Sequence, residues 1–472
     1  MDTLRDPSGK GTKAVLSWTG HIKATLTLGL PLIGAQLAQM AINVTDTVMV
    51  GWLGAPELAA VVLATQAFFL VYIFGSGFAL AVMPVAAQAH GRDDVRGVRR
   101  SVRMGMWVII LYSALIMAPL WMTEHILLAL GQVEETAKLA GDYMRVAQWA
   151  MLPSLLIMAF RSYLSALERA QIVLWATVAG TLLNAFLNYM FIFGNFGAPR
   201  LEVVGAAIAS LGTNLLIFVL MLLYCVLKPQ LRRYELMVRF WRADWQAFFE
   251  VAKLGWPIGA MILAEAGLFA GASVMIGWIG TIELAAHGIA LQLAGIAFMF
   301  PLGVSSAATV RVGNAYGRGD MIGLSRAGTV ATSLAVAITL LFACIFWTVP
   351  HVLIGWYLDE HNPDAPDVLR HGVPLLAVAA AFQLVDGLQA MGAGLLRGLK
   401  DTTVPMLIAI ISYWPVGMSA AYVFGFPLGM GAVGVWWGLA LGLSVAALLL
   451  NTRYQMRERL GLMGDAGKPA TD

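Results

Sequence analysis

Long apolar runs recur along the whole chain and are separated by short polar connections. A run of about 20 apolar residues is long enough for an α-helix to cross the hydrocarbon core of a bilayer. The pattern therefore predicts an all-α integral membrane protein with about twelve transmembrane helices. The predicted spans are 25–49, 58–86, 101–123, 143–166, 171–193, 203–227, 251–276, 285–310, 325–349, 372–396, 402–424 and 431–451.

The connections between these spans alternate in charge. Arg and Lys gather after the second, sixth, eighth and tenth predicted spans and at both ends of the chain, whereas the other connections are short or acidic. Cytoplasmic connections collect Lys and Arg. We therefore expect a multi-pass protein of the inner membrane of a bacterial-type cell, with both termini in the cytoplasm.

The first and second halves of the chain repeat each other. Residues 28–94 align without a gap on 254–320, an offset of 226 residues (254 − 28), so that "VMVGWLGAPELAA" (48–60) falls on "VMIGWIGTIELAA" (274–286). An offset of six spans preserves their orientation, which predicts two pseudo-symmetric six-helix bundles facing a central cleft. The predicted divisions are a cytoplasmic tail (1–24), an N-lobe (25–228), a cytoplasmic linker (229–250), a C-lobe (251–452) and a second cytoplasmic tail (453–472).

Composition narrows the class of protein further. The chain is 59% hydrophobic and 12% charged, whereas a soluble domain is about a quarter charged. The net charge of +3 is too small to indicate a nucleic-acid partner. The sequence contains no P-loop, H-E-x-x-H or G-x-S-x-G motif, so we expect neither an enzyme nor a resident cofactor. Transport would then use an ion gradient or the membrane potential, or it would be passive.

Three carboxylates within predicted spans are the first candidates for chemistry. Asp46, Glu265 and Asp386 each lack a cationic side chain at i±3 or i±4 in their own helix. Ionisable side chains are expensive inside a membrane and mark ion or substrate pathways. A purely structural role is the alternative, because polar side chains also join helices through hydrogen bonds.

Two asparagines in the fifth predicted span accompany these carboxylates. Asn184 and Asn188 are spaced i,i+4, which stacks their carboxamides on one side of a helix. Together with Asp46 they would offer oxygens to a cation, or hydrogen bonds that tune a carboxyl group. Hydrogen bonding between helices is an equally good explanation of this pair.

A polar stripe on the first predicted span has a counterpart in the seventh. The 226-residue offset sets Gln39 against Glu265 and Asn43 against Phe269. Residues seven apart differ by only about 20° around a helix, so Asp46 and Glu265 point to equivalent faces of the two lobes. The residues predicted to line a substrate cavity are Gln39, Asn43, Phe269 and Gln383.

Two prolines occupy equivalent places in the first and seventh predicted spans. Pro31 and Pro257 are related by the same offset. Proline inside a spanning helix frees a carbonyl group and permits a bend. The pair is therefore a candidate for two hinges, with a static kink as the alternative.

Four motifs together resemble the multidrug and toxic compound extrusion (MATE) family, and most closely its bacterial NorM-like group. They are "VTDTVMVGWLG" (44–54), "AHGIALQ" (286–292), "NAYGRGD" (314–320) and "AGLLRGLKD" (393–401). The resemblance implies a secondary active efflux transporter that exports small cationic amphipathic drugs or dyes in exchange for Na⁺ or H⁺. A lipid-linked oligosaccharide flippase of related architecture is the alternative, although its cleft would need cationic rather than acidic residues.

The resemblance also implies roles for particular residues. It indicates cation or proton coupling at Asp46 with Asn184 and Asn188, and at Glu265 and Asp386 with Phe269 beside them. Na⁺ would bind at Glu265, Asp386 or Asp46, and the choice between Na⁺ and H⁺ stays open. The expected partners are cationic drugs, a monovalent cation and the lipid bilayer, with no nucleic acid, and the expected state is a monomer.

Overall fold

The computed structural model describes residues 16–358 and 363–464, and within these ranges it contains helices and no β-strand. Residues 1–15 and 465–472 of the two predicted tails lie outside the described residues. The elements are α1 (Trp18–Gly51), α2 (Ala55–Gly91), α3 (Val95–Trp121), α4 (Thr123–Ala129), α5 (Glu134–Ala147), η1 (Gln148–Ala150), α6 (Met151–Ala166), α7 (Ala170–Phe193), α8 (Glu202–Leu227), α9 (Pro229–Arg232), α10 (Trp245–Ile279), α11 (Thr281–Gly317), α12 (Met321–Thr348), α13 (Pro350–Gly355), α14 (Ala365–Gly398), α15 (Thr403–Ile411), η2 (Ser412–Met418), α16 (Ser419–Gly425) and α17 (Gly431–Gln455).

The membrane crossings confirm the predicted all-α membrane fold. Among the described residues, eleven helices are long and apolar enough to cross a membrane. The fourth predicted span, 143–166, falls on three consecutive elements, because the 3₁₀ turn η1 interrupts the helix between α5 and α6. The eleventh predicted span is also interrupted, since the π-helical turn η2, which contains Pro415, separates α15 from α16.

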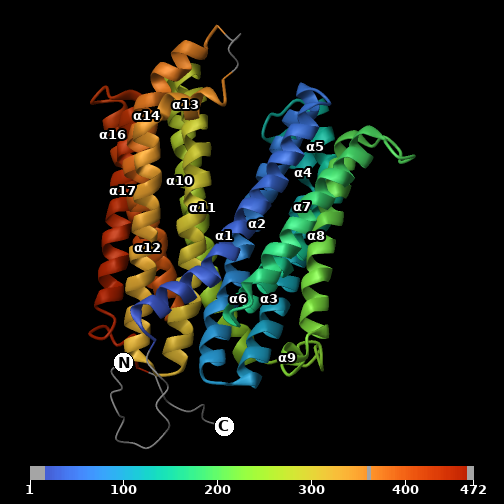
Figure 1. Cartoon of the computed structure of the whole chain (residues 1–472). Helices are drawn as coiled ribbons and strands as arrows, with labels where there is room; N and C mark the ends of the chain where they lie inside the picture. Colours follow the sequence, from blue (N-terminus) through green and yellow to red (C-terminus); the bar gives the residue numbers. More distant parts are fainter. Residues whose placement is uncertain (1–15, 359–362, 465–472) are drawn as a thin grey trace, which may run out of the picture.

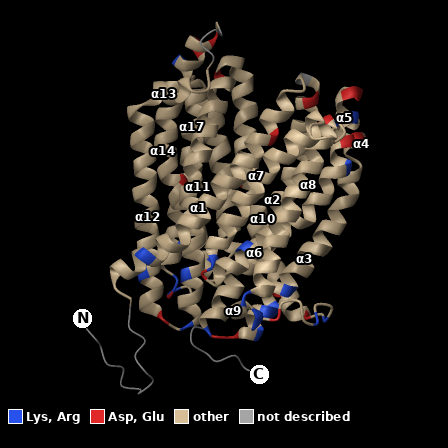
Figure 2. Ribbon diagram, turned by 45° about the vertical axis from the view of Figure 1, so that its right-hand side comes forward, with Lys and Arg blue, Asp and Glu red and all other residues tan. Residues whose placement is uncertain are grey.

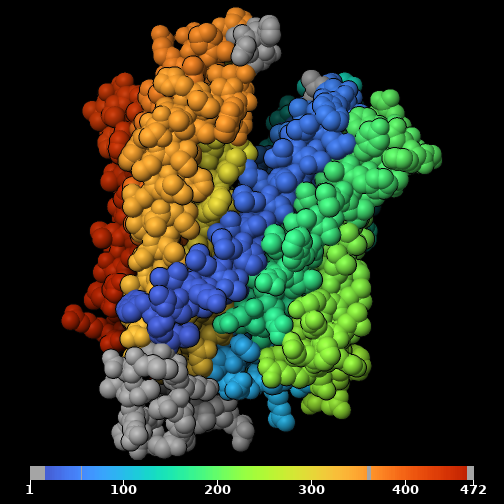
Figure 3. All heavy atoms as spheres, viewed as in Figure 1, coloured from blue at the N-terminus to red at the C-terminus, as the bar shows by residue number. Residues whose placement is uncertain are grey.

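The helices form two groups that meet at one end and separate at the other (Figure 1). The N-lobe contains α1–α8 and the C-lobe contains α10–α17. The surface is hollowed between the two lobes over the half of the molecule that is farther from α9 (Figure 3). Lys and Arg gather at the opposite end, which carries α9 (Figure 2). These two ends are called the open end and the basic end below.

Glycines let the lobes touch near the basic end. Gly77 of α2 lies against Gly255 and Gly259 of α10 so closely that a β-carbon at Gly77 would collide with their backbone atoms. A hydrogen bond also joins the two lobes, because Gln88 Nε2 of α2 donates to the carbonyl oxygen of Gly398 of α14 at 2.9 Å. The closed side of the hollow therefore combines close backbone contacts at glycines with packed side chains, since Leu32 and Met83 share a buried cluster with Val310.

Several helices extend beyond their predicted ends. α1 begins at Trp18, ahead of the predicted boundary at 25, and Ser17 caps it by accepting from the Gly20 N–H at 3.1 Å. α10 begins at Trp245, inside the predicted linker, and its cap is Asp244. Hydropathy reports only the part of a helix that lies in hydrocarbon, whereas a capping side chain decides where the backbone bonding starts.

The linker between the lobes is fastened to α3. Arg100 forms an ion pair with Asp244, and Arg103 Nη1 donates to the carbonyl oxygens of Val238 and Arg239 at 3.1 and 3.0 Å. These acceptors lie outside the helices, so hydrogen bonds within a helix could not satisfy them. The linker is thus a fixed part of the N-lobe surface up to the first residue of α10.

We expect Asp244→Ala to lower the free energy of unfolding by about 1 kcal/mol, because α10 loses its cap and Arg100 loses its partner. Burial raises the pKa of Asp244, but the bonds from Arg100 and from the Ala247 N–H outweigh burial and hold that pKa below its ordinary value of 3.8. A lowered folded pKa gives stability that is present above the unfolded pKa and lost as pH falls through the folded value.

Thermal unfolding of the purified protein at pH 7 and again below pH 4 measures this contribution. Asp367→Ala is the matched control, since within the described residues the Asp367 carboxylate forms only an exposed i,i+3 pair with Arg370 at 3.8 Å. An equal loss of stability in both variants, or an Asp244→Ala effect that is unchanged by acid, contradicts the assignment.

Candidate cation sites in the two lobes

The carboxylate of Asp46 sits where α1, α7 and α8 meet. Asn184 Nδ2 and Asn188 Nδ2 donate to its Oδ1 at 2.9 and 2.6 Å. Ser210 Oγ donates to its Oδ2 at 3.0 Å. Among the described residues, Asp46 forms no ion pair. A carboxylate held by three neutral donors keeps its negative charge available to a proton or a cation.

The asparagine pair leaves one oxygen unused beside this carboxylate. Both side chains are fully buried, and Asn188 Nδ2 also donates to Asn184 Oδ1 at 3.2 Å. Asn188 Oδ1 is buried and has no partner within the described ranges. Buried amide oxygens are normally hydrogen-bonded, so this free acceptor next to Asp46 fits a cation that binds with oxygen ligands.

Ser210 is the member of this site that the sequence analysis missed. It lies in α8, in the apolar run "GAAIASLGTN" (205–214). Serine is common in membrane helices as a packing residue, so its presence there carries no specific signal. Only the tertiary contact with Asp46 distinguishes it.

The polar stripe of α1 divides between different partners. Gln36 Oε1 accepts a hydrogen bond from Arg161 Nη1 of α6 at 3.1 Å, so its partner is this half-buried cation. Gln39 is half-buried and Asn43 is exposed, and neither side chain bonds to Asp46 in the described part of the chain. The structure therefore joins Asp46 to the asparagine pair but not to the two predicted cavity residues on its own helix.

The two carboxylates of the C-lobe come together from α10 and α14. Glu265 is half-buried and Asp386 is only 3% exposed, and the two repel each other electrostatically. Arg397, in the last turn of α14, attracts Glu265 from the side of the basic end. The sequence analysis placed two acids on separate helices, and the fold brings them close enough to interact electrostatically.

The face of α14 around Asp386 presents oxygens without donors. Gln383 Nε2 donates to the carbonyl oxygen of Ala294 at 2.9 Å, and Gln389 Nε2 donates to Tyr413 Oη at 2.5 Å. These bonds use the amide nitrogens and leave Gln383 Oε1, Asp386 Oδ1 and Gln389 Oε1 buried and unpaired in the described structure. The spacing i, i+3, i+6 places all three on one side of the helix. Such a set of oxygens suits a hard cation.

Aromatic rings border this cluster. The ring of Phe269, one turn beyond Glu265, meets Phe382 edge to face at a centroid distance of 5.9 Å. Phe382 in turn meets Trp436 at 5.4 Å, and Trp436 Nε1 donates to His287 Nδ1 at 3.1 Å. Phe269 is therefore held by the C-lobe core on one side, and its half-buried ring remains partly accessible on the other.

The two predicted hinge prolines are buried inside continuous helices. Pro31 lies within α1 and Pro257 within α10. α1 changes direction along its length (Figure 1), and an internal proline is the usual cause of such a bend. Pro257 lies two residues from Gly255 and Gly259 of the contact between the lobes, so a bend there would act directly on that contact.

Comparisons with known proteins agree with this arrangement. The family model MatE matches residues 31–190 and 257–423, one segment in each lobe. The chain is 58% identical over 438 residues to a "Probable multidrug resistance protein NorM" of Rhizobium meliloti (strain 1021), covering 93% of this chain and 94% of the relative. It is 50% identical over 448 residues to a protein of the same description from Agrobacterium fabrum, covering 95% of each.

Solved structures show the same fold at lower identity. The eukaryotic MATE transporter AtDTX14 superposes with a TM-score of 0.84 at 19% identity, over 95% of this chain and 98% of that chain. A structure described as the outward-facing conformation of a multidrug resistance MATE family transporter superposes with a TM-score of 0.83 at 21% identity, over 98% and 100% of the two chains.

The family match covers both lobes, and the similarity to the multidrug resistance proteins runs almost from end to end. Such proteins are membrane transporters and not enzymes. The chain therefore belongs to the MatE family and, within it, to the NorM-like multidrug efflux transporters.

Proposed function

We propose that this transporter exports cationic amphipathic compounds in exchange for Na⁺ or H⁺. The observation that carries the proposal is the Asp46 carboxylate, which is held by three neutral donors and has no ion pair in the described structure. Protonation or cation binding there removes the negative charge that would hold a cationic substrate. Competition between the coupling ion and the cationic substrate for this charge couples the movement of the ion to the export of the substrate.

The two lobes differ in the chemistry that surrounds their carboxylates. Three donors bond to Asp46 and only one unpaired oxygen, Asn188 Oδ1, lies beside it, whereas Gln383 Oε1 and Gln389 Oε1 flank the unpaired Asp386 Oδ1 in the described structure. A proton or an organic cation can neutralise the first, but only a cation with oxygen ligands uses the second set fully. We therefore favour Na⁺ as the coupling ion, with its site at Glu265 and Asp386 and with Gln383 and Gln389 contributing amide oxygens.

We infer the orientation of the protein in the membrane from its charge distribution. Lys and Arg gather at the basic end, where the lobes are in contact (Figure 2). Positively charged connections stay in the cytoplasm, so the hollow would open to the outside, with both chain termini in the cytoplasm. The similarity to a structure described as outward-facing supports this orientation. The monomeric state stays a prediction.

Efflux from proteoliposomes tests the coupling ion. A cationic dye is loaded, and a Na⁺ gradient is imposed at fixed pH, followed by a pH gradient at fixed Na⁺. We expect the Na⁺ gradient to drive efflux and Glu265→Gln or Asp386→Asn to abolish the dependence on Na⁺, because each removes one charge from the cation site.

Asp401→Asn is the matched control, because Asp401 is a carboxylate of the same lobe that already pairs with Arg453 at 2.6 Å. Efflux driven equally by Na⁺ in the wild type and in both C-lobe variants would overturn the Na⁺ site. Efflux driven only by the pH gradient would assign H⁺ as the coupling ion instead.

A further inference from the structure

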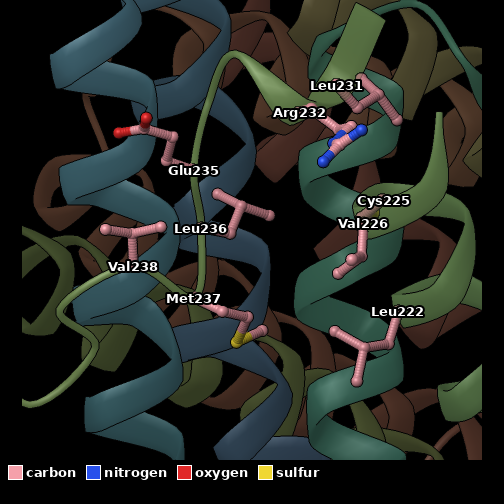
Figure 4. A pocket seen from close by; sticks show the side chains of 9 residues that line it. All are labelled: Leu222, Cys225, Val226, Leu231, Arg232, Glu235, Leu236, Met237 and Val238. Atoms are coloured by element: carbon pink, nitrogen blue, oxygen red, sulfur yellow. The ribbon is translucent and has the colours of Figure 1, made fainter. Parts of the chain in front are cut away.

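A cavity of about 320 Å³ lies at the basic end of the N-lobe, between the last turns of α8 and the linker that follows α9. The side chains of Leu222 and Val226 on α8 face Leu236 and Met237 of the linker across it (Figure 4). The Arg232 guanidinium occupies one end of the cavity. This cavity shares no residue with either carboxylate site.

The walls of the cavity are continuous with the lipid-facing surface. Val226 is 46% exposed and Val238 is 51% exposed, and Trp241 just beyond them is 77% exposed. α8 is a membrane-crossing helix that ends at Leu227, so these side chains lie at the depth where hydrocarbon meets headgroups. Exposed Trp next to Arg is typical of that boundary.

The charge at the cavity is unbalanced and positive. Glu235 also lines the cavity (Figure 4), but its carboxylate pairs with Arg99 Nη1 at 2.7 Å. The Arg232 side chain forms no ion pair or hydrogen bond with any other described residue. The neighbouring cations of the linker are Lys228, Arg233, Arg239 and Arg242.

We propose that this cavity binds an anionic phospholipid of the cytoplasmic leaflet. The phosphate would bind the Arg232 guanidinium, whose planar fork matches phosphate oxygens. The upper part of an acyl chain would lie against Leu222, Val226 and Met237, and the remainder would continue into the bilayer. Clusters of Lys and Arg immediately beyond a membrane helix recognise anionic lipids in this way.

A bound lipid would fasten the linker to α8 in addition to α3. The linker already bonds to α3 through Arg100 and Arg103 on its other side. Since α3 and α8 both belong to the N-lobe, a lipid bound in the cavity stabilises the folded N-lobe. This effect does not depend on which ion drives transport. The lipid site therefore stands independently of the proposed coupling mechanism.

Thermal unfolding of the full chain in neutral detergent tests the site. We expect phosphatidylglycerol to raise the unfolding temperature in a saturable manner and phosphatidylcholine to raise it much less. Arg232→Gln should increase the half-saturating phosphatidylglycerol concentration about fivefold, the equivalent of about 1 kcal/mol for one basic residue near a membrane surface. Arg318→Gln is the matched control, because Arg318 is an exposed arginine of the C-lobe at the same end.

Two further measurements test whether the apolar part of the cavity contributes to binding and whether a free phosphate can replace the lipid. Val226→Trp fills the apolar side of the cavity and keeps Arg232, and we expect it to weaken stabilisation by phosphatidylglycerol as well. Glycerol phosphate, which carries the headgroup without acyl chains, should give no stabilisation. Equal stabilisation by both lipids, an unchanged response in Arg232→Gln, or full stabilisation by glycerol phosphate would each overturn the proposal.

Discussion

Asp46→Asn should reduce gradient-driven efflux of a cationic dye about 100-fold, the effect of losing a charge-assisted interaction of about 3 kcal/mol. The substitution keeps the size of the side chain and one oxygen that can accept from Asn184 and Asn188, but its NH₂ group cannot accept from Ser210, and the negative charge is lost. Without this charge, the coupling ion has no differential affinity for the two conformations of the transporter. Binding of the ion then no longer shifts the equilibrium between these conformations. Initial rates in proteoliposomes measure the loss.

Substitutions of the donors should give smaller and graded losses. Ser210→Ala removes one of the three bonds to the carboxylate, and we expect efflux to fall about tenfold. Ser113→Ala is the matched control, because Ser113 is another buried serine of the N-lobe whose Oγ has no partner in the described structure. Wild-type efflux in Asp46→Asn, or equal losses in the two serine variants, would refute the role of this site.

Gly77→Val should shift the protein away from the conformation that is closed at the basic end. A valine there forces α2 away from Gly255 and Gly259, and overpacking of this kind costs about 1–3 kcal/mol. A change of that size alters the ratio of two conformations about 5- to 150-fold. Gly295→Val in α11 is the matched control, since a β-carbon placed at Gly295 would have no described atom within 4 Å apart from its chain neighbours and the adjacent backbone of its own helix.

Distance measurements between the lobes at the open end report this shift. Spin labels at Leu130 and Trp356, both more than 70% exposed on opposite lobes, would be attached after Cys225 and Cys344 are replaced by serine. We expect the distance between the two labels to be shorter in Gly77→Val, because opening of the basic end is accompanied by closure of the hollow. We also expect slower dye efflux in this variant. A distance distribution that matches the Gly295→Val control would show that the glycine contact does not hold the closed state.

The carboxylate sites show which residues sequence reasoning could select and which it could not. Asp46, Glu265 and Asp386 could be selected because an ionisable side chain in an apolar helix is rare and therefore informative. Ser210 could not, because serine in such a helix is ordinary. The polar stripe on the first helix was informative as a pattern, yet the fold assigns Gln36 to Arg161 and Asp46 to the asparagine pair. Spacing along one helix does not reveal which neighbouring helix lies opposite.

The sequence by itself determined the all-helical membrane type of the elements, the internal repeat, the basic end and the family resemblance. Each of these depends on local hydrophobicity, charge or motif, which the order of residues expresses directly. Only the tertiary structure decided which oxygens around Asp386 lack donors, that Glu265 and Asp386 form one cluster, and how closely α2 approaches α10. These properties depend on the rotation and distance of packed helices, which van der Waals contact between residues far apart in the chain sets.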